Sequence, residues 1–147
     1  MPSARNGHTA SLYSKVVIII LESRLFVLGG WLGSGAPLAA SDLYELDLDT
    51  FRWSVPKVKG RGPGPCNMHT ADFIKQKLFV FRGGDGKKYL NDLHVLDVET
   101  MEWLGAETQG TAPPPRANHS SAVVGSKLFI FGGWDGSSRL NDFYSLD

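Results

Sequence analysis

The chain contains the segments Pro113-Pro114-Pro115-Arg116-Ala117-Asn118-His119, Lys127-Leu128-Phe129-Ile130-Phe131-Gly132-Gly133 and Leu140-Asn141-Asp142, and these decide the fold because they occur twice. Each segment has a counterpart fifty positions earlier, so that His119 corresponds to His69 (119 − 69 = 50). A fixed period of this size is typical of repeat proteins, in which every repeat packs on its neighbours. Function follows less directly, since such scaffolds serve many purposes.

Each repeat is predicted to consist of short strands separated by turn residues. In the third repeat, the apolar and polar pattern predicts strands at 119–124, at 128–131, ending at the glycine pair, and at 142–146. The second repeat continues through a turn at 97–100 into a fourth strand around Trp103, and the first repeat has Trp53 at the same place. The Asp-x-x-Thr spacing in these turns indicates hairpins, because an Asp side chain can accept backbone amides. With no sustained helical periodicity, the expected fold class is all-β.

These spaced motifs resemble the kelch repeat: Pro-x-Pro-Arg-x-x-His, an apolar strand ending in Gly-Gly, Asn-Asp before a strand, and Asp-x-x-Thr-x-x-Trp. The resemblance covers nearly the whole chain and implies four-stranded β-propeller blades, usually six or seven to a closed ring. The Gly-x-x-Pro-x-Pro-Arg linker is most similar to that of kelch proteins that serve as scaffolds and adaptors. We expect structural roles for the recurring positions, namely Arg5, His8, Gly29, Gly30, Trp53, His69, Gly83, Trp103, Arg116, His119, Gly132 and Gly133.

The repeats divide the chain into residues 5–60, with an insertion near 13–22, residues 61–110, and an incomplete repeat at 111–147. We therefore expect a partial kelch propeller with two full blades and a third that lacks its outer strand. Its uncovered edges are templates for self-association. A piece of a larger propeller is favoured over pairing of two copies, because a missing strand argues against a designed half; an incomplete product without activity is a further alternative.

The insertion includes the apolar run 16–21, which is far shorter than the about 20 residues that a membrane helix needs. The three interpretations are a longer first hairpin, a translated intron or mispredicted exon boundary, and a membrane or partner anchor. Lys plus Arg equals Asp plus Glu at 15 each, which gives no indication of binding to nucleic acid or anionic membrane. A single cysteine and no leader-like opening segment favour a cytoplasmic location.

Nothing in the sequence predicts catalysis, a cofactor or a metal. The histidines at 8, 69 and 119 recur at one repeat position, which indicates a shared structural role. Kelch-like copper oxidases need a Tyr–Cys crosslink and His ligands, and iron-dependent specifier proteins need Glu-x-x-x-Asp-x-x-x-His. Here residues 45–53 have the first two spacings but end in Trp53. A fragment of such a metalloenzyme remains the alternative to a non-catalytic protein-interaction module.

Binding is expected at the loops that follow each glycine pair, because propeller loops stand at the rims of a rigid scaffold. In the middle repeat Arg82 stands at the position of Gly132, either through drift or a one-residue shift of the turn, or as a residue of the loop face with Lys87 and Lys88. Cys66 replaces Arg116. Arg82 belongs to a basic stretch, residues 57–88, which holds eight of the 15 basic residues and could attract an acidic partner, unless the strands scatter them. The tryptophans could instead pack between blades. The candidate partner-binding residues are Trp31, Arg82, Lys87, Lys88, Tyr89, Trp134 and Arg139.

Overall fold

A computed structural model describes residues 17–30 and 43–147, which form three antiparallel sheets and contain no helix. The first sheet consists of β1 (Val17–Leu21), β2 (Arg24–Leu28), β3 (Tyr44–Asp47) and β4 (Arg52–Ser54). The second consists of β5 (Thr70–Ile74), β6 (Lys77–Phe81), β7 (Leu93–Asp97) and β8 (Glu102–Leu104). The third consists of β9 (Ser120–Val124), β10 (Lys127–Trp134) and β11 (Arg139–Leu146).

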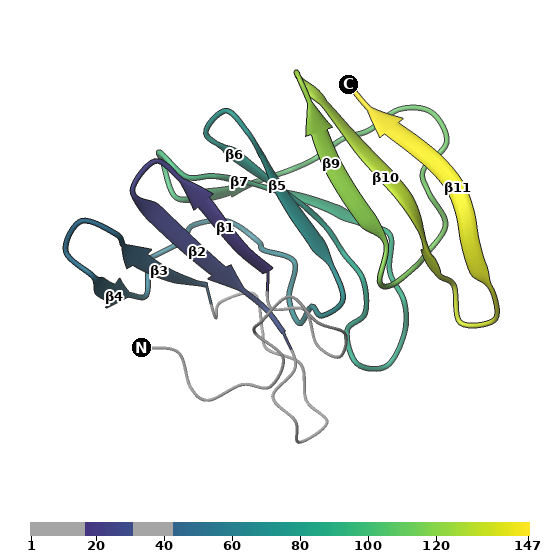
Figure 1. The fold of residues 1–147 in the computed structure, drawn as a ribbon, viewed down its shortest axis with the longest axis horizontal. Helices are drawn as coiled ribbons and strands as arrows, with labels where there is room; N and C mark the ends of the chain where they lie inside the picture. Colours follow the sequence, from purple (N-terminus) through teal and green to yellow (C-terminus); the bar gives the residue numbers. More distant parts are fainter. Residues whose placement is uncertain (1–16, 31–42) are drawn as a thin grey trace.

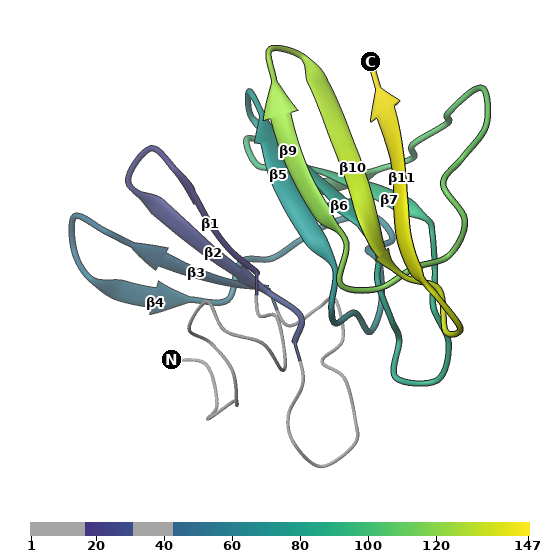
Figure 2. The same ribbon diagram turned by 45° about the vertical axis from the view of Figure 1, so that its right-hand side comes forward.

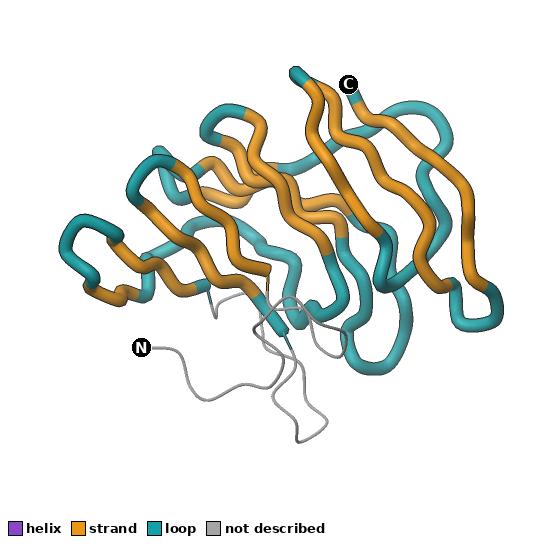
Figure 3. Tube along the Cα trace, viewed as in Figure 1, coloured by secondary structure: helices purple, strands orange, loops and turns teal. Residues whose placement is uncertain are grey.

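The sheets are successive blades that fan out side by side, as Figures 1 and 2 show. Within each blade, strands that are neighbours in sequence are neighbours in the sheet, so every connection is a hairpin or meander. The first strand of each blade, β1, β5 or β9, lies on the same side of the fan (Figure 1). Figure 3 shows that loops alone connect one blade to the next. The prediction of an all-β partial propeller with an incomplete third blade is confirmed.

The fifty-residue register of the sequence is also present in the backbone pairing. Residue 67 bridges residue 84 in the second blade, and residue 117 bridges residue 134 in the third. One strand boundary differs from the prediction: β10 does not stop at the glycine pair but continues to Trp134. Gly132, at φ 60°, absorbs a bulge in the ladder, and pairing resumes at Gly133 opposite Leu140.

The two Asp-x-x-Thr hairpins form as predicted. Asp47 Oδ1 accepts the backbone amides of Asp49 and Thr50 at 2.9 and 2.8 Å. Asp97 Oδ1 accepts those of Glu99 and Thr100 at 3.0 and 3.2 Å. These bonds satisfy amides at the turn and explain why the outer hairpins of the first two blades share one geometry.

The apolar run in the first repeat is an inner strand. β1 pairs with β2 from Val17 opposite Leu28 to Leu21 opposite Arg24, and β5 pairs with β6 in the same way. Within the described residues both hairpins have five-residue strands and a two-residue turn. Residues 1–16 lie outside the described residues, so the longer-hairpin interpretation of the insertion stays a prediction.

Two apolar clusters join the blades face to face. Between the first two blades, Phe26 and Leu28 pack with Leu78, Val80 and Leu96, all 0% exposed. Between the second and third, the cluster contains Phe81, Leu128 and Ile130. Alternation along β10 places Leu128 and Ile130 on this covered face, and Phe131, which is 51% exposed, on the opposite face. The third blade therefore presents one open apolar face and, at β11, one open strand edge.

Candidate protein-binding surfaces

The third blade is fastened by a fully buried arginine. Arg116 donates from Nη1 to the carbonyl of Gly132 at 2.9 Å and from Nη2 to Asp142 Oδ2 at 2.8 Å. Its Nε donates to the carbonyl of Pro114, and the guanidinium lies 5.3 Å from the centre of the Tyr144 ring. Hydrogen bonds from Arg116 hold the pKa of Asp142 below its ordinary value, although partial burial opposes this. One side chain thus satisfies a carbonyl of the linker, a carbonyl of β10 and an acidic residue together.

In the second blade the same role is filled from another strand. Cys66 occupies the position of Arg116, and Arg82, at the position of Gly132, reaches back to Asp92, the counterpart of Asp142. Arg82 Nη1 donates to Asp92 Oδ2 at 3.0 Å, and its Nη2 donates to the carbonyl of Pro65 at 2.9 Å. Only 13% of the Arg82 side chain is exposed. The structure therefore places this guanidinium inside the blade, not on the loop face with Lys87 and Lys88, which was one of the interpretations of its sequence position.

Two of the recurring histidines, His69 and His119, lie between blades. His119 is fully buried, its Nε2 is 2.9 Å from the hydroxyl of Thr70 in the second blade, and its ring meets Phe81 edge-on at 5.0 Å. His69 is also fully buried, and its ring lies against the backbone of Gly29 in the first blade. His94 is half-buried beside Trp103, and its Nε2 lies 2.6 Å from Asp92 Oδ2.

Two of the predicted binding loops lie at the same end of the blades (Figure 1). Asp85 Oδ1 accepts the amides of Lys87 and Lys88 at 2.8 and 2.9 Å, and Asp135 Oδ1 accepts those of Ser137 and Ser138, both at 2.7 Å. These amides hold the pKa of each carboxyl below its ordinary value. The turns are therefore shaped by their own aspartates, which leaves the lysines exposed.

The side chains of these loops differ in exposure. Lys87, Lys88 and Arg139 are exposed, whereas Tyr89 and Trp134 are half-buried. The Tyr89 ring lies close to the backbone of Gly136, so the loop of the third blade rests on that of the second. We name this group the rim surface and define it as Lys87, Lys88, Tyr89, Trp134 and Arg139.

The remaining predicted residues are distributed as follows. The basic stretch 57–88 does not form one patch, because Lys75 precedes β6 and Lys87 follows it, at opposite ends of that strand. Trp103 is 7% exposed and belongs to the first apolar cluster, whereas Trp53 is half-buried. Arg5, His8 and Trp31 lie outside the described residues.

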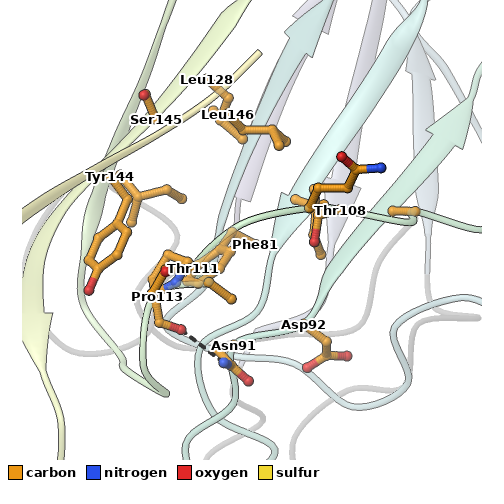
Figure 4. Close-up of a pocket in the computed structure, with 15 residues that line it drawn as sticks. Phe81, Asn91, Asp92, Thr108, Thr111, Pro113, Leu128, Tyr144, Ser145 and Leu146 are labelled. Carbon is orange, nitrogen blue, oxygen red and sulfur yellow. Dashed lines mark hydrogen bonds between the residues drawn. The ribbon is translucent and has the colours of Figure 1, made fainter.

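A cavity of about 260 Å³ opens between the second and third blades. Figure 4 shows Tyr144 and Leu146 of β11 on one side and Thr108 of the connecting segment on the other. Leu128 also lines it, and Asn91 Nδ2 donates to the carbonyl of Pro113 at 2.8 Å at its lower margin. The wall is apolar where the third blade provides it. We name this cavity the β11 pocket.

Two observations concern the reactivity of the described residues. Among residues 17–30 and 43–147, no three His, Cys, Asp or Glu side chains gather as metal ligands would. Burial raises the pKa of the Cys66 thiol to about 12, so the sulfur is a neutral thiol at physiological pH. No helix in this part of the chain is long and apolar enough to cross a membrane.

Sequence reasoning missed the Arg82–Asp92 pair and the β11 pocket. The Arg82–Asp92 pair had a signal in the sequence. Cys66 and Arg82 both depart from the third repeat, and the guanidinium lost at position 66 is supplied at position 82. The pocket had none, because it depends on how the linker at 105–113 lies beside the third blade.

Comparison with known proteins agrees with this architecture. A model of the KLHDC2/KLHL20/DRC7 Kelch-repeats domain matches residues 7–147. Human host cell factor 2 is 39% identical over 83 residues, which are 56% of this chain and 10% of that protein. The Rho GTPase-activating protein gacHH of Dictyostelium discoideum is 37% identical over 82 residues, 56% of this chain and 5% of that protein.

A third relative, the Rab9 effector protein with kelch motifs of Xenopus laevis, is 34% identical over 88 residues, which are 60% of this chain and 22% of that protein. The similarity therefore spans less than a quarter of each of these relatives. The family match, in contrast, includes all three blades and the residues that fasten them. The chain belongs to the kelch-repeat family.

Proposed function

We propose that the chain is a non-catalytic protein-interaction module, part of an adaptor or scaffold, that binds a protein partner through the rim surface. One observation carries this proposal: exposed cations stand beside half-buried aromatic rings on turns that are fixed by Asp85 and Asp135. Rigid loops keep the entropy cost of binding low, and Arg, Tyr and Trp are the side chains that most often carry interface energy.

The relatives support the coarser part of this proposal. One of them is named a Rab9 effector protein with kelch motifs and another a Rho GTPase-activating protein, and this chain matches a part of each. Lys87, Lys88 and Arg139 give the rim surface a local excess of positive charge. This favours a partner with an acidic surface, because attraction between opposite charges speeds the encounter of two proteins.

Catalysis by a nucleophilic cysteine is disfavoured by the chemistry of the site. The single thiol is buried and neutral, and it faces Gly29 in the contact between blades. We therefore propose a binding role in preference to a fragment of a metalloenzyme. Elemental analysis of the purified chain tests this, and a transition metal present in a one-to-one ratio would contradict it.

Charge reversal at the rim surface tests the proposal in cells. A Lys87→Glu/Lys88→Glu variant should lose the partner proteins that proximity labelling finds around the wild-type chain. The matched control is Lys75→Glu/Lys77→Glu, which makes the same charge change at the other end of β6. Equal loss from both variants, or from neither, would contradict binding at the rim.

We further propose a cytoplasmic location for this module. The supporting observation is Cys66, a free cysteine without a second cysteine in the chain. Imaging of a fluorescent fusion of the chain tests this, and a signal confined to the secretory pathway would contradict it.

A further inference from the structure

Met68 lies where the segments that lead into β5 and β9 meet. Its carbonyl accepts the backbone amide of Asn118 at 3.1 Å, and its Sδ accepts a hydrogen bond from Asn118 Nδ2 at 3.5 Å. The two residues hold the same position in successive repeats (118 − 68 = 50). One residue of the third repeat therefore contacts both the main chain and the thioether of Met68.

The backbone conformation does not account for a methionine at this position. The φ angle is 51° at Met68 and 54° at Asn118, in the left-handed region. Glycine and asparagine adopt this region most readily, and the sequence has Gly7 at the same position of the first repeat. A long side chain is strained at such a φ, so its presence here indicates a use for the thioether itself.

The sulfur atoms of Met68 and Met101 have different surroundings. Met68 is half-buried, belongs to neither apolar cluster, and hydrogen-bonds the exposed Asn118. Met101 packs against the first apolar cluster, and its Sδ lies 3.8 Å from Arg24 Nη2. That guanidinium also binds both carboxylate oxygens of Glu45. Because oxidation of a methionine sulfur follows its exposure, the two residues should differ in reactivity.

We propose that Met68 is a site of reversible oxidation by a hydroperoxide, and that Asn118 holds the added oxygen. A lone pair of Met68 Sδ attacks one oxygen of hydrogen peroxide, so that an S–O bond forms as the O–O bond breaks. The departing hydroxide takes the proton from the transferred oxygen and leaves as water. The sulfur loses an electron pair, which the peroxide gains. The sulfoxide oxygen then accepts the Nδ2–H of Asn118 that the sulfur accepts in the thioether.

The modified side chain lies at the base of the rim surface. Met68 Cε lies 3.5 Å from the place that a Cβ on Gly84 would take, and the carbonyl oxygen of Lys88 lies 3.7 Å from the same place. Gly84 precedes the Asp85 turn. A polar sulfoxide in place of the apolar thioether therefore changes the packing beneath this loop. This consequence deepens the proposed function and rests on it only where a partner is concerned.

Peptide mapping after brief treatment with hydrogen peroxide tests the site. Trypsin leaves Met1, Met68 and Met101 in three different peptides. In the folded 147-residue chain Met68 should gain an oxygen at least about fivefold faster than Met101, and the two rates should converge in urea. Tandem mass spectrometry distinguishes an oxygen on Met68 from one on Cys66 of the same peptide. Equal rates in the folded chain, or a difference that persists in urea, would overturn the proposal.

The role of Asn118 is tested by an isosteric variant. Asn118→Asp keeps the shape and the tolerance of positive φ, and it removes the Nδ2 donor. The rate at Met68, relative to that at Met101, should fall about threefold, which is within the effect of one hydrogen bond. Asn141→Asp is the matched control, since Asn141 is exposed on β11 and its change should leave the ratio as it is. The same ratio in both variants would contradict a role for Asn118.

The effect on the loop is measured without a partner. In nuclear magnetic resonance spectra of the labelled chain, the amide signals of Gly84 and Lys88 should move on oxidation. They should return after treatment with methionine sulfoxide reductases A and B. Met68→Leu, treated with peroxide in the same way, should show no such movement. Unmoved signals in a chain whose Met68 is oxidised would contradict the link to the rim.

The rim variant separates this inference from the proposed function. Lys87→Glu/Lys88→Glu leaves the thioether and Asn118 in place, so its Met68 should oxidise as in the wild type. If Met68 resists peroxide while the rim variant still loses its partners in cells, the oxidation proposal is wrong and the rim proposal stands. If Met68 oxidises and the rim variant keeps its partners, the reverse holds.

Discussion

Replacement of Arg116 by methionine should be the most damaging single change in the third blade. The substitution keeps most of the apolar bulk and removes a guanidinium whose side chain is 0% exposed. Three contacts are lost, those to the carbonyls of Pro114 and Gly132 and to the carboxylate of Asp142. The carboxylate and the carbonyls would then lack their donor.

The expected loss in the free energy of unfolding follows from the burial of the Arg116–Asp142 ion pair. Breaking a buried ion pair by removal of one partner costs about 3–5 kcal/mol. Asp142 is 34% exposed, so water can solvate part of its charge, and the lower end of that range, about 3 kcal/mol, is expected. Arg82→Met should cost about half as much, because Asp92 is 43% exposed and keeps its bond to His94.

Urea-induced unfolding, followed by circular dichroism, provides the measurement. Arg139→Met is the control, since Arg139 is exposed and its replacement should change stability by no more than about 0.5 kcal/mol. The double variant Arg116→Met/Asp142→Leu should regain part of the loss, because it leaves no charged partner behind. Stability of Arg116→Met within about 0.5 kcal/mol of Arg139→Met would refute the reasoning.

Three further predictions follow from single sites. The Cys66 thiol, with its pKa raised to about 12 by burial, should resist iodoacetamide at pH about 8 in the folded chain and react in urea; prompt reaction of the folded chain would contradict its placement. The pKa of Asp142 is depressed, so its contribution to stability is present above the unfolded pKa of about 3.9 and is lost as pH falls through the lower folded value. Asp142→Asn should therefore flatten the acid limb of a curve of unfolding free energy against pH. An unchanged limb would be evidence against the ion pair. Gly133→Ala should lower the melting temperature, because φ is 106° at Gly133 and a Cβ there would lie 2.7 Å from the carbonyl oxygen of Ala117. Gly105→Ala is the control, since a Cβ at Gly105 would meet open space. Similar melting temperatures of the two variants would count against this backbone geometry.

The order of strands could be predicted from the sequence because two periodicities agree. Alternation of apolar residues identifies strands such as β6 and β10, and the fifty-residue period aligns them, so the blade-to-blade contacts follow. The hairpin connectors at Asp47 and Asp97 could also be predicted from the sequence, since their hydrogen bonds are local.

The positions of charges could not be predicted from the sequence in the same way. The neighbours of Arg82 in sequence left its position open between a shift of the turn and a place on the loop face. Its guanidinium is drawn inward by Asp92, ten residues away across the blade. The β11 pocket likewise depends on the path of a linker, which no periodic pattern describes. The end of β10 was misplaced because a glycine at positive φ can extend a strand through a bulge as well as end it.

The contact between the second and third blades tests the central claim, that successive repeats pack face to face as propeller blades. Phe81 and His119 lie on different blades, and their rings meet edge-on with centroids 5.0 Å apart. Nuclear Overhauser spectroscopy of the labelled chain should show cross-peaks between the protons of these two rings, together with a ring-current shift of the imidazole signals. Assigned spectra of the folded chain without those cross-peaks would contradict the stacking of the blades.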